Sequence, residues 1–176
     1  YLSAELSKLH VEGYKLVVSK TLKMGISGTR AHVHLTHSDG HAHGQHKHEH
    51  GNHHDGHRNL SAITDIINRS TLNDFVKEKS LQMFREIARA EAKIHDKSLD
   101  EIHFHEVGAI DSIVDIVGAA VCIDYLKPEK ILASPVELGG GFVKCAHGTF
   151  PVPAPATAEI LKDVPVKKGA AESETT

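Results

Sequence analysis

A histidine-rich segment interrupts this chain and limits how it can fold. From His37 to His57 the sequence reads HSDGHAHGQHKHEHGNHHDGH, in which Ala42 is the only apolar residue. A segment of this composition cannot bury a hydrophobic core, so we expect a long disordered loop. The fold must then be built from the flanking segments, 1–36 and 59–176, with 37–58 as a flexible insert.

The same segment predicts metal binding. Tags used for purification are homopolymeric and lie at termini, whereas this tract is interrupted and lies between segments with folding patterns. Imidazole is mostly neutral at pH 7 and binds nickel, copper and zinc. Flexible ligands at variable spacing suit storage better than catalysis. The predicted storage ligands are His37, His41, His43, His46, His48, His50, His53, His54 and His57.

The flanking segments predict an α+β fold, with a mixed sheet packed against helices. Residues 1–9 have the spacing of a helix end, and 14–19 and 30–36 alternate as the strands of a hairpin. His32 and His34 lie on the polar face of the second strand, where we interpret them as solvated residues.

A helical middle follows the insert. Asn59 is the expected N-cap of a short helix, and Thr71 with Asp74 resembles the capping box of a longer one. Ser98 and Glu101 form a second capping box. The buried stripe of the longer helix is predicted to comprise Leu72, Phe75, Val76, Met83, Ile87 and Ile94.

Towards the end of the chain, strands are expected over 130–136 and 164–166, with a short helix over 154–161 between them. Net charge is −3, which gives no general attraction to nucleic acid. No apolar run is long enough for a membrane span. Two cysteines and no visible signal peptide are compatible with the cytoplasm.

The segment HFHEVGAIDSIVDIVGAAVCIDYL, from His103 to Leu126, combines nitrogen and oxygen donors. His103 and His105 share one side if the backbone is extended, and Glu106 follows them. Asp111 and Asp115 share one face of the helix expected next. These residues make a plausible half-site for a transition metal.

This helix has apolar residues on nearly every side, so we expect it to be buried. Asp111, Asp115, Gly118 and Cys122 fall on one narrow line along it. Buried carboxylates need a metal or an ionic partner. Two interpretations stay open: metal ligation, or Asp111 as an N-cap with Asp115 paired to a basic residue. Cys122 is expected to be a packed thiol.

A second half-site is predicted in the segment ELGGGFVKCAHGTF. Cys145 and His147 share a strand face and could bind metal, although a buried thiol beside a hydrogen-bonded imidazole is equally compatible. The preceding glycines would let the backbone approach a ligand closely, and their spacing matches no P-loop or dinucleotide fingerprint. They are Gly139, Gly140 and Gly141.

Three motifs behind a histidine-rich insert carry a family resemblance: HFHEVGAIDSIVDIVGAA, ASPVELGGGFVKCAHGTFPVPAPAT and EILKDVPV. The chain resembles the nickel-insertion proteins of nickel-pincer cofactor synthesis, the family that serves lactate racemase and related enzymes. The resemblance implies that a short segment precedes this chain, that a C-terminal domain follows it, and that the chain is a fragment.

The resemblance also implies a reaction, insertion of Ni²⁺ into pyridinium-3,5-bisthiocarboxylic acid mononucleotide. CTP and Mn²⁺ or Mg²⁺ would be required, with CTP bound by the C-terminal part. The product would pass to lactate racemase or a related apoenzyme. His103, His105, Glu106, Asp111, Asp115, Cys145 and His147 would surround the transfer site. A non-catalytic nickel or zinc storage module is the main alternative, a metal-dependent hydrolase is a third, and a homo-oligomer is left open.

Overall fold

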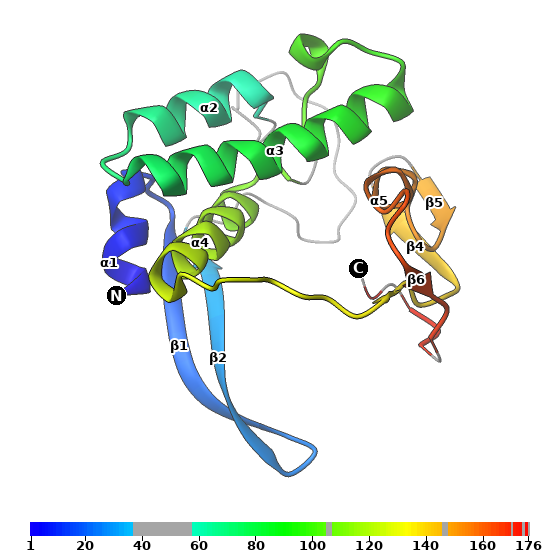
Figure 1. The fold of residues 1–176 in the computed structure, drawn as a ribbon, viewed down its shortest axis with the longest axis horizontal. Coiled ribbons are helices and arrows are strands. Elements are labelled where there is room, and N and C mark those ends of the chain that lie inside the picture. Colours follow the sequence, from blue (N-terminus) through cyan, green and yellow to red (C-terminus); the bar gives the residue numbers. More distant parts are fainter. Residues whose placement is uncertain (37–57, 105–106, 146–147, 170, 174, 176) are drawn as a thin grey trace, which may run out of the picture.

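The computed structural model describes residues 1–36, 58–104, 107–145, 148–169, 171–173 and 175. It is an α+β structure in which a helical body carries a long β-hairpin and a group of small elements near the C-terminus (Figure 1). In chain order the elements are α1 (Leu2–Leu6), the 3₁₀ turn η1 (Ser7–Leu9), β1 (Tyr14–Lys23), β2 (Ile26–Leu35), α2 (Leu60–Arg69), α3 (Asp74–His95), η2 (Leu99–Glu101), α4 (Ile110–Leu126), β3 (Val136–Glu137), β4 (Phe142–Cys145), β5 (Gly148–Pro151), α5 (Pro155–Ile160) and β6 (Val166–Lys167).

The hydrophobic core lies where α2, α3 and α4 meet, with α1 closing one end. Phe84 of α3 and Phe104, just ahead of α4, are both fully buried, and their ring centres are 6.4 Å apart. Burying each aliphatic or aromatic side chain of this kind stabilises a fold by about 1.5–3 kcal/mol. The core also includes Leu6, Leu9, Ile63, Ile67, Leu72, Val76, Leu81, Ile102, Ile113, Val114, Val117 and Val121.

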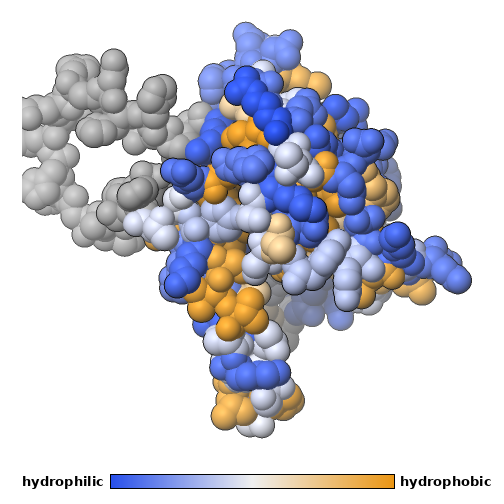
Figure 2. Space-filling model, turned by 90° about the vertical axis from the view of Figure 1, so that its left-hand side faces the viewer, coloured by the Kyte–Doolittle hydropathy of each residue, from blue (hydrophilic) through white to orange (hydrophobic). Residues whose placement is uncertain are grey.

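The predicted hairpin is confirmed, and its strands are longer than expected. β1 and β2 are ten residues each and pair antiparallel from Tyr14↔Leu35 to Lys23↔Ile26. At the base, Leu16 packs partly on the core, whereas at the tip Met24 is 96% exposed. The hairpin projects from the helical body, and apolar side chains gather along this projection (Figure 2).

The strands form three separate two-stranded sheets in the described part of the chain, where we expected a mixed sheet. β3 pairs parallel with β6, and β4 pairs antiparallel with β5. The strand predicted over 130–136 is wrong, because only its last residue pairs with another strand. Ile131 and Leu132 lie instead in the extended connection after α4 and are 67% and 78% exposed.

The helix starts only partly follow the predictions. Asn59 caps α2 as expected, with its side chain accepting a hydrogen bond from the N–H of Ala62. The Ser98–Glu101 capping box is also confirmed, at the start of η2. The Thr71 box is wrong, because Asn73 caps α3 by accepting a hydrogen bond from the N–H of Val76.

The predicted buried stripe of α3 needs a correction. Phe75 and Ile94 are exposed, while Ser80 and Ala88 are fully buried. The buried positions advance four residues at a time and include small side chains between the large ones: Val76, Ser80, Phe84, Ala88 and Ala92. A pattern that counts only large apolar residues misses such positions.

An ion pair connects the C-terminal elements with the helical body. Nζ of Lys93 on α3 lies 2.6 Å from Oε1 of Glu159 on α5, and this hydrogen bond lowers the pKa of Glu159. Within the described residues, no helix has the length and apolar character needed to cross a bilayer.

Candidate metal site at the start of helix α4

The chain leaves the hairpin beside the first residue of α4. The N–H of Thr36, the last described residue before the histidine tract, donates a 2.8 Å hydrogen bond to the carbonyl of Gly13. Gly13 in turn lies against α4, because a Cβ built on it would be 3.4 Å from Cδ1 of Ile110. The N-terminal boundary of the tract is therefore held close to the start of α4.

The chain returns from the tract at the same place. Arg58, the first described residue after it, accepts a 3.1 Å hydrogen bond from the N–H of Phe104 through its carbonyl. Its Nη1 donates a 2.9 Å hydrogen bond to the carbonyl of Gly108. Both boundaries of the tract thus lie beside the segment that leads into α4.

Gly108 is required at its position for steric reasons. A Cβ there would lie 2.9 Å from the backbone nitrogen of Arg58 and 3.1 Å from the carbonyl oxygen of Phe104. Contacts this short are not tolerated, so the close approach of the two segments depends on the missing side chain. Sequence reasoning did not assign a role to Arg58 or Gly108. The sequence clue to both residues was their position, because Arg58 directly follows the tract and Gly108 comes shortly after the HFHE motif.

His103 is positioned by its neighbours and directed away from the core. Its backbone forms an antiparallel bridge with Asn59, and the residues on each side, Ile102 and Phe104, are buried. Because side chains alternate along an extended segment, the imidazole of His103 is exposed to solvent. His105 and Glu106 lie outside the described residues.

Asp111 and Asp115 occupy the first turns of α4. Asp111 is half-buried, and its Oδ1 accepts a 2.9 Å hydrogen bond from the N–H of Ser112. Carboxylates are favoured here because the N-terminus of a helix carries a partial positive charge. The N-cap is Ala109, so the interpretation of Asp111 as an N-cap is wrong. None of the ion pairs among the described residues involves Asp111 or Asp115.

The expectation that α4 is buried on all sides is wrong. Asp115 and Cys122 are exposed, and only Gly118 of the predicted line is buried, close to Leu2 of α1. α4 packs on α1, α3 and β2, and these neighbours leave one side open. The thiol of Cys122 is therefore not a core group, and the carboxylate of Asp115 keeps its hydration.

The second predicted half-site lies on the other group of elements. Cys145 ends β4, where its backbone pairs with Gly148 of β5, and His147 lies outside the described residues. Of the glycines before β4, Gly139 and Gly141 have positive φ values of 75° and 84°. Ser173 approaches Gly139 and Glu172 approaches Gly141, and the carbonyl of Ser173 accepts a 3.3 Å hydrogen bond from the N–H of Gly140.

The described candidates do not gather into one metal centre. Across residues 1–36, 58–104, 107–145 and the later described segments, no three His, Cys, Asp or Glu side chains form a group that could hold an ion. The nine tract histidines named above lie outside the described residues, as do His105, Glu106 and His147. The predicted ligand set therefore stays a prediction.

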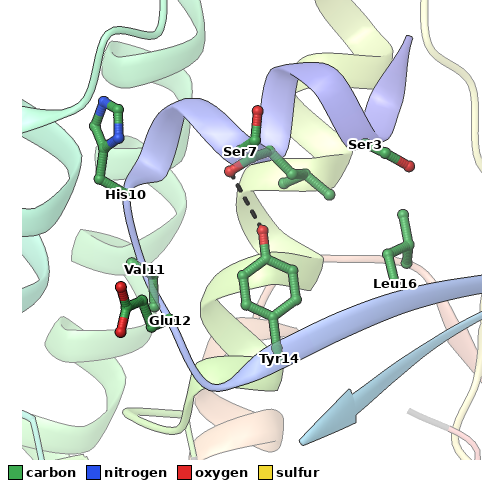
Figure 3. A pocket seen from close by; sticks show the side chains of 8 residues that line it. Ser3, Ser7, His10, Val11, Glu12, Tyr14 and Leu16 are labelled. Atoms are coloured by element: carbon green, nitrogen blue, oxygen red, sulfur yellow. Dashed lines mark hydrogen bonds between the residues drawn. The ribbon is translucent and has the colours of Figure 1, made fainter. Parts of the chain in front are cut away.

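A cavity of about 450 Å³ opens between α1 and the foot of β1 (Figure 3). Tyr14 closes one side, where its hydroxyl donates a 3.3 Å hydrogen bond to the carbonyl of Leu6, and burial raises the pKa of Tyr14. The other residues that line the cavity are Ser3, Leu6, Ser7, His10, Val11, Glu12 and Leu16. Of the predicted metal ligands that the structure describes, none lines this cavity.

Comparisons with known proteins identify the family. The family model described as "Nickel insertion protein" matches residues 1–176. A protein of Clostridium kluyveri named pyridinium-3,5-bisthiocarboxylic acid mononucleotide nickel insertion protein is 59% identical over 177 residues, which cover 100% of this chain and 43% of the relative. A protein of the same name from Clostridium acetobutylicum is 53% identical over 197 residues, covering 100% of this chain and 46% of the relative.

A third relative, from Maridesulfovibrio salexigens, is 52% identical over 188 residues, covering 100% of this chain and 45% of the relative. The chain therefore spans less than half the length of these three relatives. No solved structure matches it significantly. The match over the whole chain, together with the identities above, shows that the chain belongs to the nickel insertion protein family.

Proposed function

We propose that this chain is the N-terminal part of an enzyme that inserts Ni²⁺ into pyridinium-3,5-bisthiocarboxylic acid mononucleotide, giving a nickel-pincer nucleotide. The relatives' names supply the substrate and the reaction. The observation that carries the proposal is that donors from both predicted segments lie near the boundaries of the histidine tract. The exposed His103 forms a backbone bridge with Asn59, just after the tract, and Asp111 follows Ile110, the residue that Gly13 lies against at the end of the hairpin. A metal gathered by the tract would be released beside these donors.

The donor chemistry suits a transfer step. An insertion site must bind Ni²⁺ firmly enough to load it and weakly enough to surrender it to the sulfur atoms of the nucleotide. Imidazole and carboxylate ligands meet this need better than a closed thiolate cage. In the proposal, His103, His105, Glu106, Asp111, Asp115, Cys145 and His147 bind the ion or orient its ligands, and Gly139–Gly141 border the nucleotide.

The larger scheme belongs to the whole protein. In it, 1–36 and 59–176 form one domain interrupted by the insert over 37–58, and a further C-terminal domain binds CTP with Mn²⁺ or Mg²⁺. The protein acts in the cytoplasm, and lactate racemase or a related apoenzyme receives the product.

The test replaces His103 and His105 by Ala in the full-length protein. Both substitutions should abolish formation of the nickel nucleotide while the unfolding temperature is unchanged, because His103 is exposed and contributes nothing to the core. His10→Asn is the matched control, since His10 is also exposed and its left-handed backbone tolerates Asn. Nickel nucleotide formed at the wild-type rate by the double variant would refute the assignment.

The tract is tested separately. Deleting Ser38–Gly56 should lower the number of Ni²⁺ ions bound per chain and leave insertion intact at saturating Ni²⁺. Loss of insertion under those conditions would contradict a storage role.

The alternative function is a nickel or zinc buffer without catalysis. It is favoured by the tract itself, whose nine histidines at variable spacing suit storage better than catalysis. Turnover separates the two functions, because an insertase converts many nucleotides per chain, whereas a buffer releases only the metal it has bound.

A further inference from the structure

Two histidines outside the predicted ligand set lie face to edge on strand β2. The ring centres of His32 and His34 are 4.4 Å apart and the ring planes are at 88°. Both side chains are exposed. Two imidazoles bound at neighbouring positions of a tetragonal ion, with metal–nitrogen bonds of about 2.1 Å, have ring centres roughly 4.5 Å apart. The pair therefore already has the spacing of two adjacent nickel ligands.

The strand holds this pair in place. β2 is paired with β1 along its whole length, with His34 opposite Lys15 and His32 opposite Val17. Val33, between the two histidines, is half-buried and packs on the core. Because side chains alternate along a strand, both imidazoles lie on the face that points away from the core. Little backbone freedom therefore remains to be lost when a metal binds.

We propose that His32 and His34 form a two-histidine site for Ni²⁺, with the other coordination positions left to water or to an incoming ligand. Tetragonal geometry with nitrogen ligands selects Ni²⁺ or Cu²⁺ over Zn²⁺, which prefers a tetrahedral arrangement. Two protein ligands give a weak, exchangeable site. The choice of nickel between these two ions rests on the proposed function, while the site itself rests on the geometry of the pair.

Two positive charges lie beside the His32–His34 pair and allow a further test of the site. Lys15 lies directly across the hairpin from His34, and Arg30 lies two residues from His32 on the same face. Cβ atoms of opposed residues are about 4.5–5.5 Å apart, so the Lys15 ammonium can repel a bound cation. Lys15→Gln should therefore strengthen nickel binding roughly twofold. Simple edge-to-face packing of the rings would give no such response.

The experiment is a calorimetric titration with Ni²⁺ of the chain in which the tract histidines 37–57 are replaced by Gln at constant length. A site that requires His32 and His34 should remain, distinct from the proposed transfer site that His103→Ala would remove. His32→Gln or His34→Gln alone should weaken it about 100-fold, because the second imidazole of a chelate acts at a high effective concentration.

The matched control moves one histidine to Thr36, the residue directly after β2. In His34→Gln with Thr36→His the number of histidines is unchanged, but the two are about 13 Å apart and cannot bind one ion together. Binding should be lost as in the single variants. The proposal would be overturned if this control bound Ni²⁺ as tightly as the chain that keeps His32 and His34, or if the single variants did not change the affinity for Ni²⁺.

A second measurement uses the intact sequence. Ni²⁺ should protect His32 and His34 together from modification by diethyl pyrocarbonate, mapped by mass spectrometry, and leave His10 reactive. Modification of His32 and His34 at the metal-free rate would also overturn the site. If Ni²⁺ protects the two histidines but the full-length protein inserts no nickel into the nucleotide, the proposed function is contradicted and the site is not.

Discussion

Nη1 of Arg58 donates a 2.9 Å hydrogen bond to the carbonyl oxygen of Gly108. This bond joins the residue that follows the histidine tract to the turn that precedes α4, although the two are fifty positions apart in the chain. The tract is thereby attached at the place where His103 and Asp111 lie. Under the proposed function, nickel stored by the tract would be delivered directly to these donors.

Arg58→Ala should weaken this attachment. A hydrogen bond from a charged donor contributes about 1.5–3 kcal/mol, so the free energy of unfolding should fall by an amount in this range. Nickel transfer from the tract should slow as well. Chemical denaturation and single-turnover insertion measure the two effects.

Lys77→Ala is the matched control for Arg58→Ala. Nζ of Lys77 also donates to a backbone carbonyl, that of Asn68, at 3.1 Å, but on the exposed surface. Its loss should change stability by less than about 0.5 kcal/mol. Equal effects of the two variants would contradict a special role for Arg58.

Gly108→Ala should be strongly destabilising. The added methyl group would lie about 3 Å from three backbone atoms of Arg58 and Phe104, which cannot move as a flexible side chain could. We expect a loss of about 1–3 kcal/mol, measured by thermal and denaturant unfolding. Gly28→Ala is the control, because no atom lies within 4 Å of a Cβ built there. A neutral Gly108→Ala would mean that the two segments can separate at no cost.

Asn73→Ala should destabilise the protein by about 1 kcal/mol through loss of the α3 cap. The same amide also donates a 2.8 Å hydrogen bond to Oδ2 of Asp124 on α4, so the loss could be somewhat larger. Thr71→Ala should be nearly neutral, because the Thr71 side chain does not cap the helix. The denaturant midpoints of the two variants show which residue caps α3, Asn73 as in the structure or Thr71 as the sequence suggested.

Asp115→Asn should separate function from stability. Asp115 is exposed, and none of the ion pairs among the described residues involves it, so its substitution should leave the free energy of unfolding within about 0.5 kcal/mol of the wild type. If its carboxylate binds nickel, formation of the nickel nucleotide should fall at least tenfold. Unchanged insertion would remove Asp115 from the ligand set, and Glu78→Gln on the exposed side of α3 controls for the loss of one negative charge.

Local patterns in the sequence predicted the elements whose stability is local. The hairpin followed from alternation around Met24–Gly25, and the caps at Asn59 and Ser98 followed from side chains that bond to their own backbone. The three motifs also identified the family, which the comparisons confirm. Such signals act over a few residues and need no knowledge of the rest of the fold.

What the sequence left undecided depended on which elements pack together. Asp115 and Cys122 are exposed because α1, α3 and β2 cover only part of α4, and no periodicity within α4 reveals which side stays open. Segment 130–136 has the composition of a strand, but among the residues that the structure describes only its last residue, Val136, pairs with another strand. The sequence by itself therefore determined the local elements and the family. Only the tertiary structure decided that Arg58 meets Gly108, because that contact depends on steric fit between segments far apart in the chain.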